Sequence, residues 1–147
     1  MIKTFRGLLA DEGQQRIRLS TKQGKIGYKI INFQIMAHEP GEKSQEALVK
    51  IFKVKQGSVT DLVDFSDGNL LAAAYAGWRI DANGSDTPGP IIFEQEVFNQ
   101  DIYVTHKDVN TGELCNYYLE LESFNLTDNA AAVSTLRDIR LNPQVGG

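Results

Sequence analysis

Short stretches of alternating apolar and polar residues run along most of the chain, and turn-forming residues separate them at intervals of roughly 8 to 12 positions. The clearest alternation lies between Cys115 and Glu122, where Tyr117, Leu119 and Leu121 occupy every second position. A period of two places successive side chains on opposite faces of a strand. Many short strands of this kind predict an all-β fold, either an antiparallel β-sandwich or a jelly-roll-like barrel.

The region from Ile91 to Phe124 predicts three strands joined by two tight turns, which would pair in sequence as a meander. Ile102 and Val104 match the apolar row of the last strand and are expected to face inward. The opposite face carries acids and aromatic residues: Glu94, Glu96, Tyr103, Thr105, Lys107, Tyr118, Glu120 and Glu122. We expect a contact patch there, with an ordinary solvated sheet face as the alternative.

The first half of the chain predicts further strands. Residues 16–19 alternate, with Arg16 and Arg18 on the exposed side. Between Ile26 and Met36 the apolar phase changes, which indicates a β-bulge near Ile30 or a strand that crosses between two sheets.

Two other segments carry mixed signals. The lysines of residues 47–55 are typical of an exposed edge strand, where Lys50, Lys53 and Lys55 would discourage unwanted pairing. Residues 69–78 are rich in alanine, which favours a helix, but Gly77 and the β context favour a strand, and we predict a strand.

One helix is predicted at the C-terminal end, over about residues 128–140. Thr127 or Asp128 supplies a capping oxygen, and Leu136 and Ile139 recur at helical spacing. With a length of 147 residues and 41% hydrophobic content, the chain fits one domain over residues 1–147.

Charge is unevenly distributed along the chain. Residues 1–57 hold eleven Lys and Arg against five Asp and Glu, a net charge of +6, while residues 58–147 hold four against fourteen, a net charge of −10. Opposite charge at the two ends of a domain suits contact with a partner, including another copy of itself, although two unrelated solvated surfaces are an equal alternative.

A single cysteine, Cys115, excludes an intramolecular disulfide and indicates synthesis in a reducing compartment. Its place in the alternating pattern predicts a buried apolar group instead of a catalytic thiol. The N-terminus has no apolar run typical of a secretory signal, and no stretch reaches membrane-spanning length, so no membrane role is expected.

Catalytic and metal-binding motifs are missing from the sequence. His38 and His106 are far apart, and neither belongs to a cluster of potential metal ligands. No Gly-x-Ser-x-Gly elbow and no Gly-Lys-Ser/Thr phosphate loop occurs. We therefore expect no enzyme activity, no catalytic residue, no cofactor and no metal.

Two acidic loops carry a calcium hypothesis, against which ordinary turns are the simpler interpretation. They contain Asp61, Asp64 and Asp67 in one loop, and Asp81, Asn83 and Asp86 in the other. The basic residues of the first third could contact phosphates, but the acidic total and the lack of interleaved aromatics argue against nucleic-acid binding. They are Arg6, Arg16, Arg18, Lys22, Lys25 and Lys29.

Three segments, residues 91–105, 115–122 and 135–140, resemble small virion structural proteins of tailed bacteriophages, particularly marine ones, and residues 17–21 and 27–30 are similar too. The resemblance implies a non-enzymatic building block that is present in many copies in a capsid or tail. It carries no functional residue across, because no site motif is shared.

Several functional expectations follow. The first is a capsid decoration (cement) protein on a repetitive shell, made in the host cytoplasm, located in the virion, and in contact with other virion proteins and with its own copies. A tail, neck or baseplate component is the alternative, and a glycan-binding β-module using Trp78 and Tyr75 is a second one. The expected interface residues are Glu94, Glu96, Tyr103, Tyr118, Glu120, Glu122, Arg16 and Arg18.

Overall fold

The computed structural model describes residues 1–78, 87–127 and 130, and all eight elements named in it are strands. The strands are β1 (Ile2–Leu9), β2 (Gln14–Ile17), β3 (Ile26–Ala37), β4 (Gln45–Phe52), β5 (Leu70–Trp78), β6 (Thr87–Phe93), β7 (Ile102–Asp108) and β8 (Cys115–Asn125).

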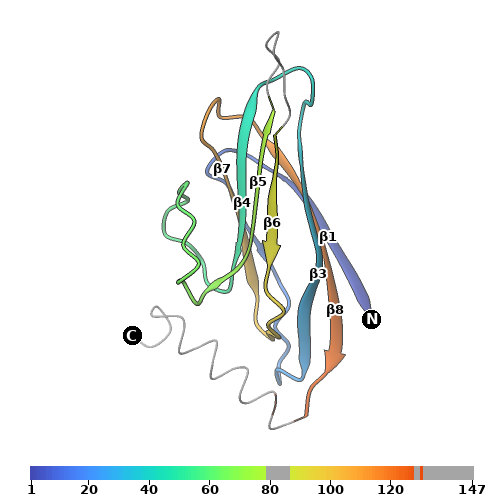
Figure 1. Cartoon of the computed structure of the whole chain (residues 1–147). Coiled ribbons are helices and arrows are strands. Elements are labelled where there is room, and N and C mark those ends of the chain that lie inside the picture. Colours follow the sequence, from blue (N-terminus) through green and yellow to red (C-terminus); the bar gives the residue numbers. More distant parts are fainter. Residues whose placement is uncertain (79–86, 128–129, 131–147) are drawn as a thin grey trace.

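The strands form two antiparallel sheets that lie against each other (Figure 1). One sheet has three strands in the order β1-β8-β3, and the other has five in the order β2-β7-β4-β5-β6. The prediction of an all-β, antiparallel fold is confirmed. The predicted C-terminal helix lies outside the described residues, although the Ala130 amide donates a hydrogen bond to the Thr127 hydroxyl at 3.2 Å, as expected of a capping residue.

The predicted meander is wrong, although its three strands exist. Among the described strands, β6 pairs with β5 at the edge of its sheet and β7 pairs with β2 and β4, while β8 belongs to the other sheet. The segment between β6 and β7 passes β3 instead of making a tight turn, and Tyr28 and Phe98 exchange two backbone hydrogen bonds there, at 2.8 and 2.9 Å. This crossing occupies the position that a two-residue turn was expected to fill.

The apolar core lies between the two sheets. Leu119 and Leu121 from β8 belong to the same buried cluster as Val49 and Ile51 from β4. The alternation correctly predicted the burial of five further residues: Ile17, Leu19, Ile102, Val104 and Tyr117.

β3 shows the expected change of phase. Its pairing with β8 shifts between Ile30 and Asn32, and this bulge leaves Ile31 as the extra residue. Ile30 and Phe33 can therefore both face the core although they are three positions apart. The alanine-rich segment is a strand, β5, as predicted.

The prediction of an exposed lysine edge is wrong for β4. This strand lies in the middle of its sheet between β7 and β5, and Lys50 and Lys53 are buried, while Lys55 is exposed. The Lys50 ammonium donates a hydrogen bond to the Leu62 carbonyl at 2.5 Å, so residues 53–69 cover it. The edges of this sheet are β2 and β6, and β6 includes Pro88 and Pro90, which have no N–H group to donate.

Within the described residues, no helical segment combines the length and the apolar character that crossing a membrane requires.

Candidate contact face on the three-stranded sheet

The expected interface residues do not form one surface. Tyr118, Glu120 and Glu122 lie on β8 in the three-stranded sheet. Arg16 and Tyr103 are paired neighbours on β2 and β7 in the five-stranded sheet. Glu94, Glu96 and Arg18 lie just outside the strands. Two candidate surfaces therefore replace the single predicted patch.

Two residues on the five-stranded side already have internal partners. The Arg16 Nε donates to Asp101 Oδ2 at 2.7 Å, and Lys53 Nζ lies 2.6 Å from Glu96 Oε1. The Lys53 side chain is almost fully buried, so Glu96 neutralises a charge that has left water. Both pairs stabilise the fold, and their charges are less available to a partner.

Asp101 connects β2 with β7. Besides Arg16, its carboxylate accepts hydrogen bonds from the Leu19 and Ser20 amides at 2.7 and 2.8 Å. Burial alone would raise the pKa of this carboxyl, but the two backbone donors and Arg16 outweigh burial and lower the pKa to about 2. Asp101 is therefore charged in the folded state at any ordinary pH.

The outward side of the three-stranded sheet offers more exposed chemistry, and we refer to it as the outer face. Strand alternation and the printed register arrange its side chains in four rows across β1, β8 and β3. The rows are Ile2, Glu122 and Lys29; Thr4, Glu120 and Asn32; Arg6, Tyr118 and Gln34; and Leu8, Asn116 and Met36. Large apolar side chains are held in water at both ends, since Ile2 and Met36 are each 62% exposed.

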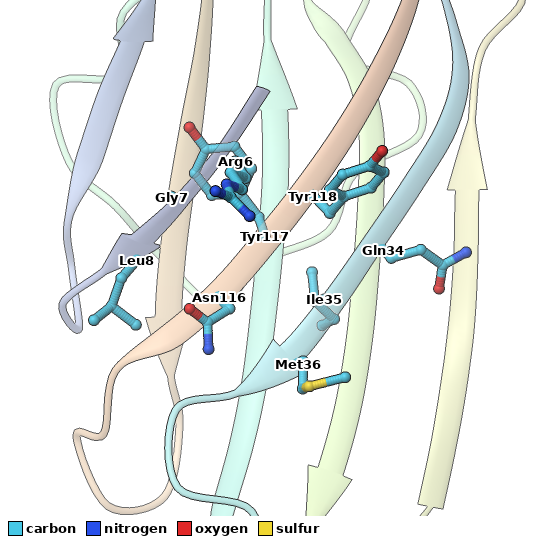
Figure 2. A pocket seen from close by; sticks show the side chains of 9 residues that line it. All are labelled: Arg6, Gly7, Leu8, Gln34, Ile35, Met36, Asn116, Tyr117 and Tyr118. Carbon is cyan, nitrogen blue, oxygen red and sulfur yellow. The ribbon is translucent and has the colours of Figure 1, made fainter. Parts of the chain in front are cut away.

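A pocket of about 700 Å³ hollows one end of the outer face (Figure 2). Its walls are side chains of the last two rows, which Figure 2 shows on three neighbouring strands. The strand segments at Gly7, Ile35 and Tyr117 complete the lining. The pocket combines an apolar end at Leu8 and Met36 with an aromatic ring, two amides and one cation.

Gly7 is required for the packing beneath this pocket. A Cβ atom at this position would lie 2.8 Å from both the Tyr117 ring and the Gln15 amide oxygen. The Tyr117 hydroxyl donates a hydrogen bond of 2.7 Å to that same oxygen, linking the two sheets. Burial raises the pKa of Tyr117 to about 12, so the phenol stays protonated and keeps donating.

Tyr118 and the acidic residues occupy the middle and the far end of the outer face. The Tyr118 hydroxyl donates to Glu120 Oε1 at 2.9 Å, and this bond raises the pKa of the phenol. Glu122 lies 3.5 Å from Lys29 Nζ, in a pair that is open to solvent on both sides. Such an exposed pair contributes little to stability, so both groups can rearrange toward a partner.

Of the two residues expected to bind a glycan, Tyr75 is the one whose side chain the structure describes. The Tyr75 hydroxyl donates to Glu46 Oε1 at 2.6 Å, on the sheet opposite the pocket. The side chain of Trp78 lies outside the described residues.

The first acidic loop forms turns, as the simpler interpretation predicted. Asp64 Oδ1 accepts hydrogen bonds from the Ser66 amide and hydroxyl, and Asp67 Oδ1 accepts one from the Asn69 amide. In the part of the chain that the structure describes, no three His, Cys, Asp or Glu side chains are grouped as a metal site requires. The second acidic loop, at residues 81–86, lies outside that part.

Cys115 is fully buried, and this burial raises the pKa of the thiol to about 12, so the prediction of a buried apolar group is confirmed. His106 is also buried, and its Nδ1 lies 3.1 Å from the Leu9 and Ala10 carbonyls. Both carbonyls are acceptors, so we place the ring proton on Nδ1.

The basic and acidic parts of the sequence do not become two ends of the molecule. β1 and β3 from the basic part lie in one sheet, whereas β2 and β4 lie in the other. The basic residues considered for nucleic-acid binding are accordingly divided between both sheets and the segment that connects β2 to β3.

Sequence reasoning missed Leu8, Met36, Gln34 and Asn116. The alternation of each strand does place these four residues on the outward side. To see that they share one surface, however, one must know that β8 pairs between β1 and β3. It also missed three exposed apolar residues that lie within the first acidic loop itself: Leu62, Val63 and Phe65.

No protein-family model matches the chain, and no curated protein matches it either. Among solved structures, the chain is similar to the crystal structure of a mitogen derived from Yersinia pseudotuberculosis, with 14% sequence identity, a TM-score of 0.31 and 87% of each chain covered. A similarity of this size supports no inference about fold or function.

Proposed function

We propose that this protein is a non-enzymatic structural component of a phage virion, with a β-sandwich body that is used for contact with neighbouring subunits. The first choice is a decoration protein that docks on a repetitive capsid shell. The supporting observation is the outer face, where Ile2, Leu8 and Met36 stand exposed beside a tyrosine and two glutamates. Exposed apolar groups mixed with charges are typical of a protein contact surface.

The acidic end of the outer face carries the specificity of this contact. Glu120 and Glu122 lie two positions apart on the central strand β8, so the sheet fixes the spacing of their backbone positions. Fixed charges at a rim select partners and steer their approach. The partner surface on the shell is then expected to be basic.

The test is to locate the protein in purified particles and count its copies. With Glu120→Lys and Glu122→Lys combined, we expect attachment to fall at least about tenfold, because two attractive contacts become repulsive. A matched control reverses Glu39 and Glu42, two exposed acids in the turn between β3 and β4. Unchanged attachment of the first variant, or absence of the protein from particles, would contradict the proposal.

A tail, neck or baseplate position is the alternative within the same class. It differs in the expected copy number and symmetry, because tail components form rings or stacks whereas decoration proteins follow the shell lattice. Electron micrographs of labelled particles separate the two positions directly.

A glycan-binding module is the second candidate function, and the pocket is the observation that favours it. Tyr118 offers a ring for stacking on a sugar, while Gln34 and Asn116 offer amide donors and acceptors. A glycan array probed with the protein and with a Tyr118→Ala variant tests this candidate. Sugar binding by the parent that the variant loses supports it, and no binding by the parent removes it.

A further inference from the structure

A second exposed surface lies on the opposite side of the molecule from the pocket. Residues 53–69 connect β4 to β5 and project beyond the five-stranded sheet, whereas β1, β8 and β3 form the other side (Figure 1). This loop presents Leu62 and Phe65, which are 67% and 69% exposed, together with Val63. We call these three residues the crest.

The crest is held in place by a hydrogen bond from β4 and by hydrogen bonds within the loop. Lys50 Nζ holds the Leu62 carbonyl at 2.5 Å, and the Lys53 amide donates to the Asn69 carbonyl at 2.8 Å where the loop closes. Between them, Asp64 accepts two hydrogen bonds from Ser66. The hydrogen bonds keep these apolar side chains exposed to solvent, so they do not contribute the stabilisation that burial would give. Exposed apolar groups on an ordered loop are typical of a surface that binds a partner.

The crest and the pocket are complementary in polarity. The crest offers two aliphatic side chains and one aromatic, and the pocket has an apolar end at Leu8 and Met36. Its volume of about 700 Å³ falls within the range of roughly 300 to 1,000 Å³ that is usual for binding pockets.

The two surfaces are also complementary in charge. Asp61, Asp64 and Asp67 alternate with the crest residues along the chain, and residues 59–69 contain no lysine or arginine. The pocket lining contains one charged residue, Arg6, and no acid. An acidic loop is therefore attracted to the cationic pocket and is a poor ligand for an anionic membrane surface.

We propose that the crest of one copy docks in the pocket of a second copy, so that molecules associate head to tail. This inference rests on the proposed function, because it names the neighbour that part of the outer face contacts. Since the two surfaces lie on opposite sides, a docked pair keeps one free crest and one free pocket. Such a heterologous contact generates rings or open stacks instead of a closed two-fold dimer.

The experiment uses two blocked variants of the whole chain and sedimentation velocity over a range of concentrations. Phe65→Asp blocks the crest, and Met36→Asp combined with Arg6→Glu blocks the pocket. All three residues are exposed, so we expect circular dichroism and thermal unfolding to stay close to those of the parent. A Val109→Asp variant places the same charge at an exposed apolar position outside both surfaces.

We expect the parent and the Val109→Asp control to form species larger than dimers as concentration rises, and each blocked variant alone to stay monomeric. Mixing the two blocked variants should yield a 1:1 complex that grows no further, because one intact crest and one intact pocket remain. A parent that stays monomeric, a parent that stops at a dimer, or blocked variants that associate like the parent would each overturn the proposal.

Particle analysis separates this inference from the proposed function. If blocked variants enter particles at the copy number of the parent, the head-to-tail contact is wrong while the structural role stands. If the parent is absent from particles, the structural role is wrong whatever the sedimentation result.

Discussion

At the scale of single residues, local pattern predicted burial well wherever a side chain faces another strand directly. Tyr117, Cys115 and Leu119 are buried as their alternation indicates, because a period of two leaves no other choice once one face is apolar. Lys50 and Lys53 show where this reasoning fails. Their burial depends on a covering loop and on Glu96, and no local pattern encodes either partner.

Gly7 gives a prediction at this scale. We expect Gly7→Ala to lower the free energy of unfolding by about 1 to 3 kcal/mol, since the new methyl group overlaps the Tyr117 ring and the Gln15 oxygen. Chemical denaturation measures the change. Gly57→Ala is the matched control, because a Cβ there meets nothing within 4 Å. Equal stability of the two variants would show that the ring moves aside without cost.

At the scale of elements, the strands themselves could be predicted but their partners could not. The alternation located β2, β7 and β8, and the change of phase in β3 located its bulge. The meander failed because sequence neighbours were assumed to be sheet neighbours. In the structure, residues 94–101 cross past β3 at Tyr28 and Phe98, so that β7 can pair with β4. The outer face depended on the pairing of β8 between β1 and β3 and was therefore missed as a unit.

The junction of β2 and β7 carries a pH prediction through Asp101. A carboxyl whose pKa is lowered on folding adds stability that is complete above its unfolded pKa, near 4, and is lost as pH falls toward the folded pKa of about 2. We expect the free energy of unfolding to fall by about 2 kcal/mol from this group across that window. Denaturant titrations at a series of pH values measure the loss.

In an Asp101→Asn variant this part of the acid sensitivity should be absent, and stability at neutral pH should be lower by about 1 to 3 kcal/mol, because the ion pair with Arg16 is gone. Asp61→Asn removes an exposed carboxylate in the loop and serves as the control. An Asp101→Asn variant as acid-sensitive as the parent would contradict the assignment of the lowered pKa to this network.

At the scale of the whole molecule, the sequence predicted two antiparallel layers but misplaced their charge. The net charges of +6 and −10 belong to two parts of the chain that the topology interleaves, so they do not form opposite poles. The charge asymmetry that the structure retains is local, with an acidic loop on one side of the molecule and a cationic pocket on the other. A map of charge along the sequence cannot reveal this, because the strand order decides which residues share a surface.

This local charge predicts how self-association responds to salt. Raising ionic strength screens the attraction between the acidic loop and Arg6, so the association constant should fall, with the apolar part of the contact left in place. Sedimentation at low and high salt measures the effect. The Arg6→Glu variant is the control, since its association should strengthen as salt screens the repulsion. An association constant for the parent that rises with salt would contradict the electrostatic part of the contact.

The prolines of β6 have a consequence for any crowded assembly of this protein. Open strand borders at high local concentration tend to fuse neighbouring molecules into continuous fibrous sheets that do not come apart. Pro88 and Pro90 remove two backbone donors from the edge strand β6, which makes it a poorer template for strand pairing, so copies are expected to meet through side chains and to separate again on dilution. Assembly through such contacts is reversible, so a misplaced subunit can dissociate and bind again while the array forms.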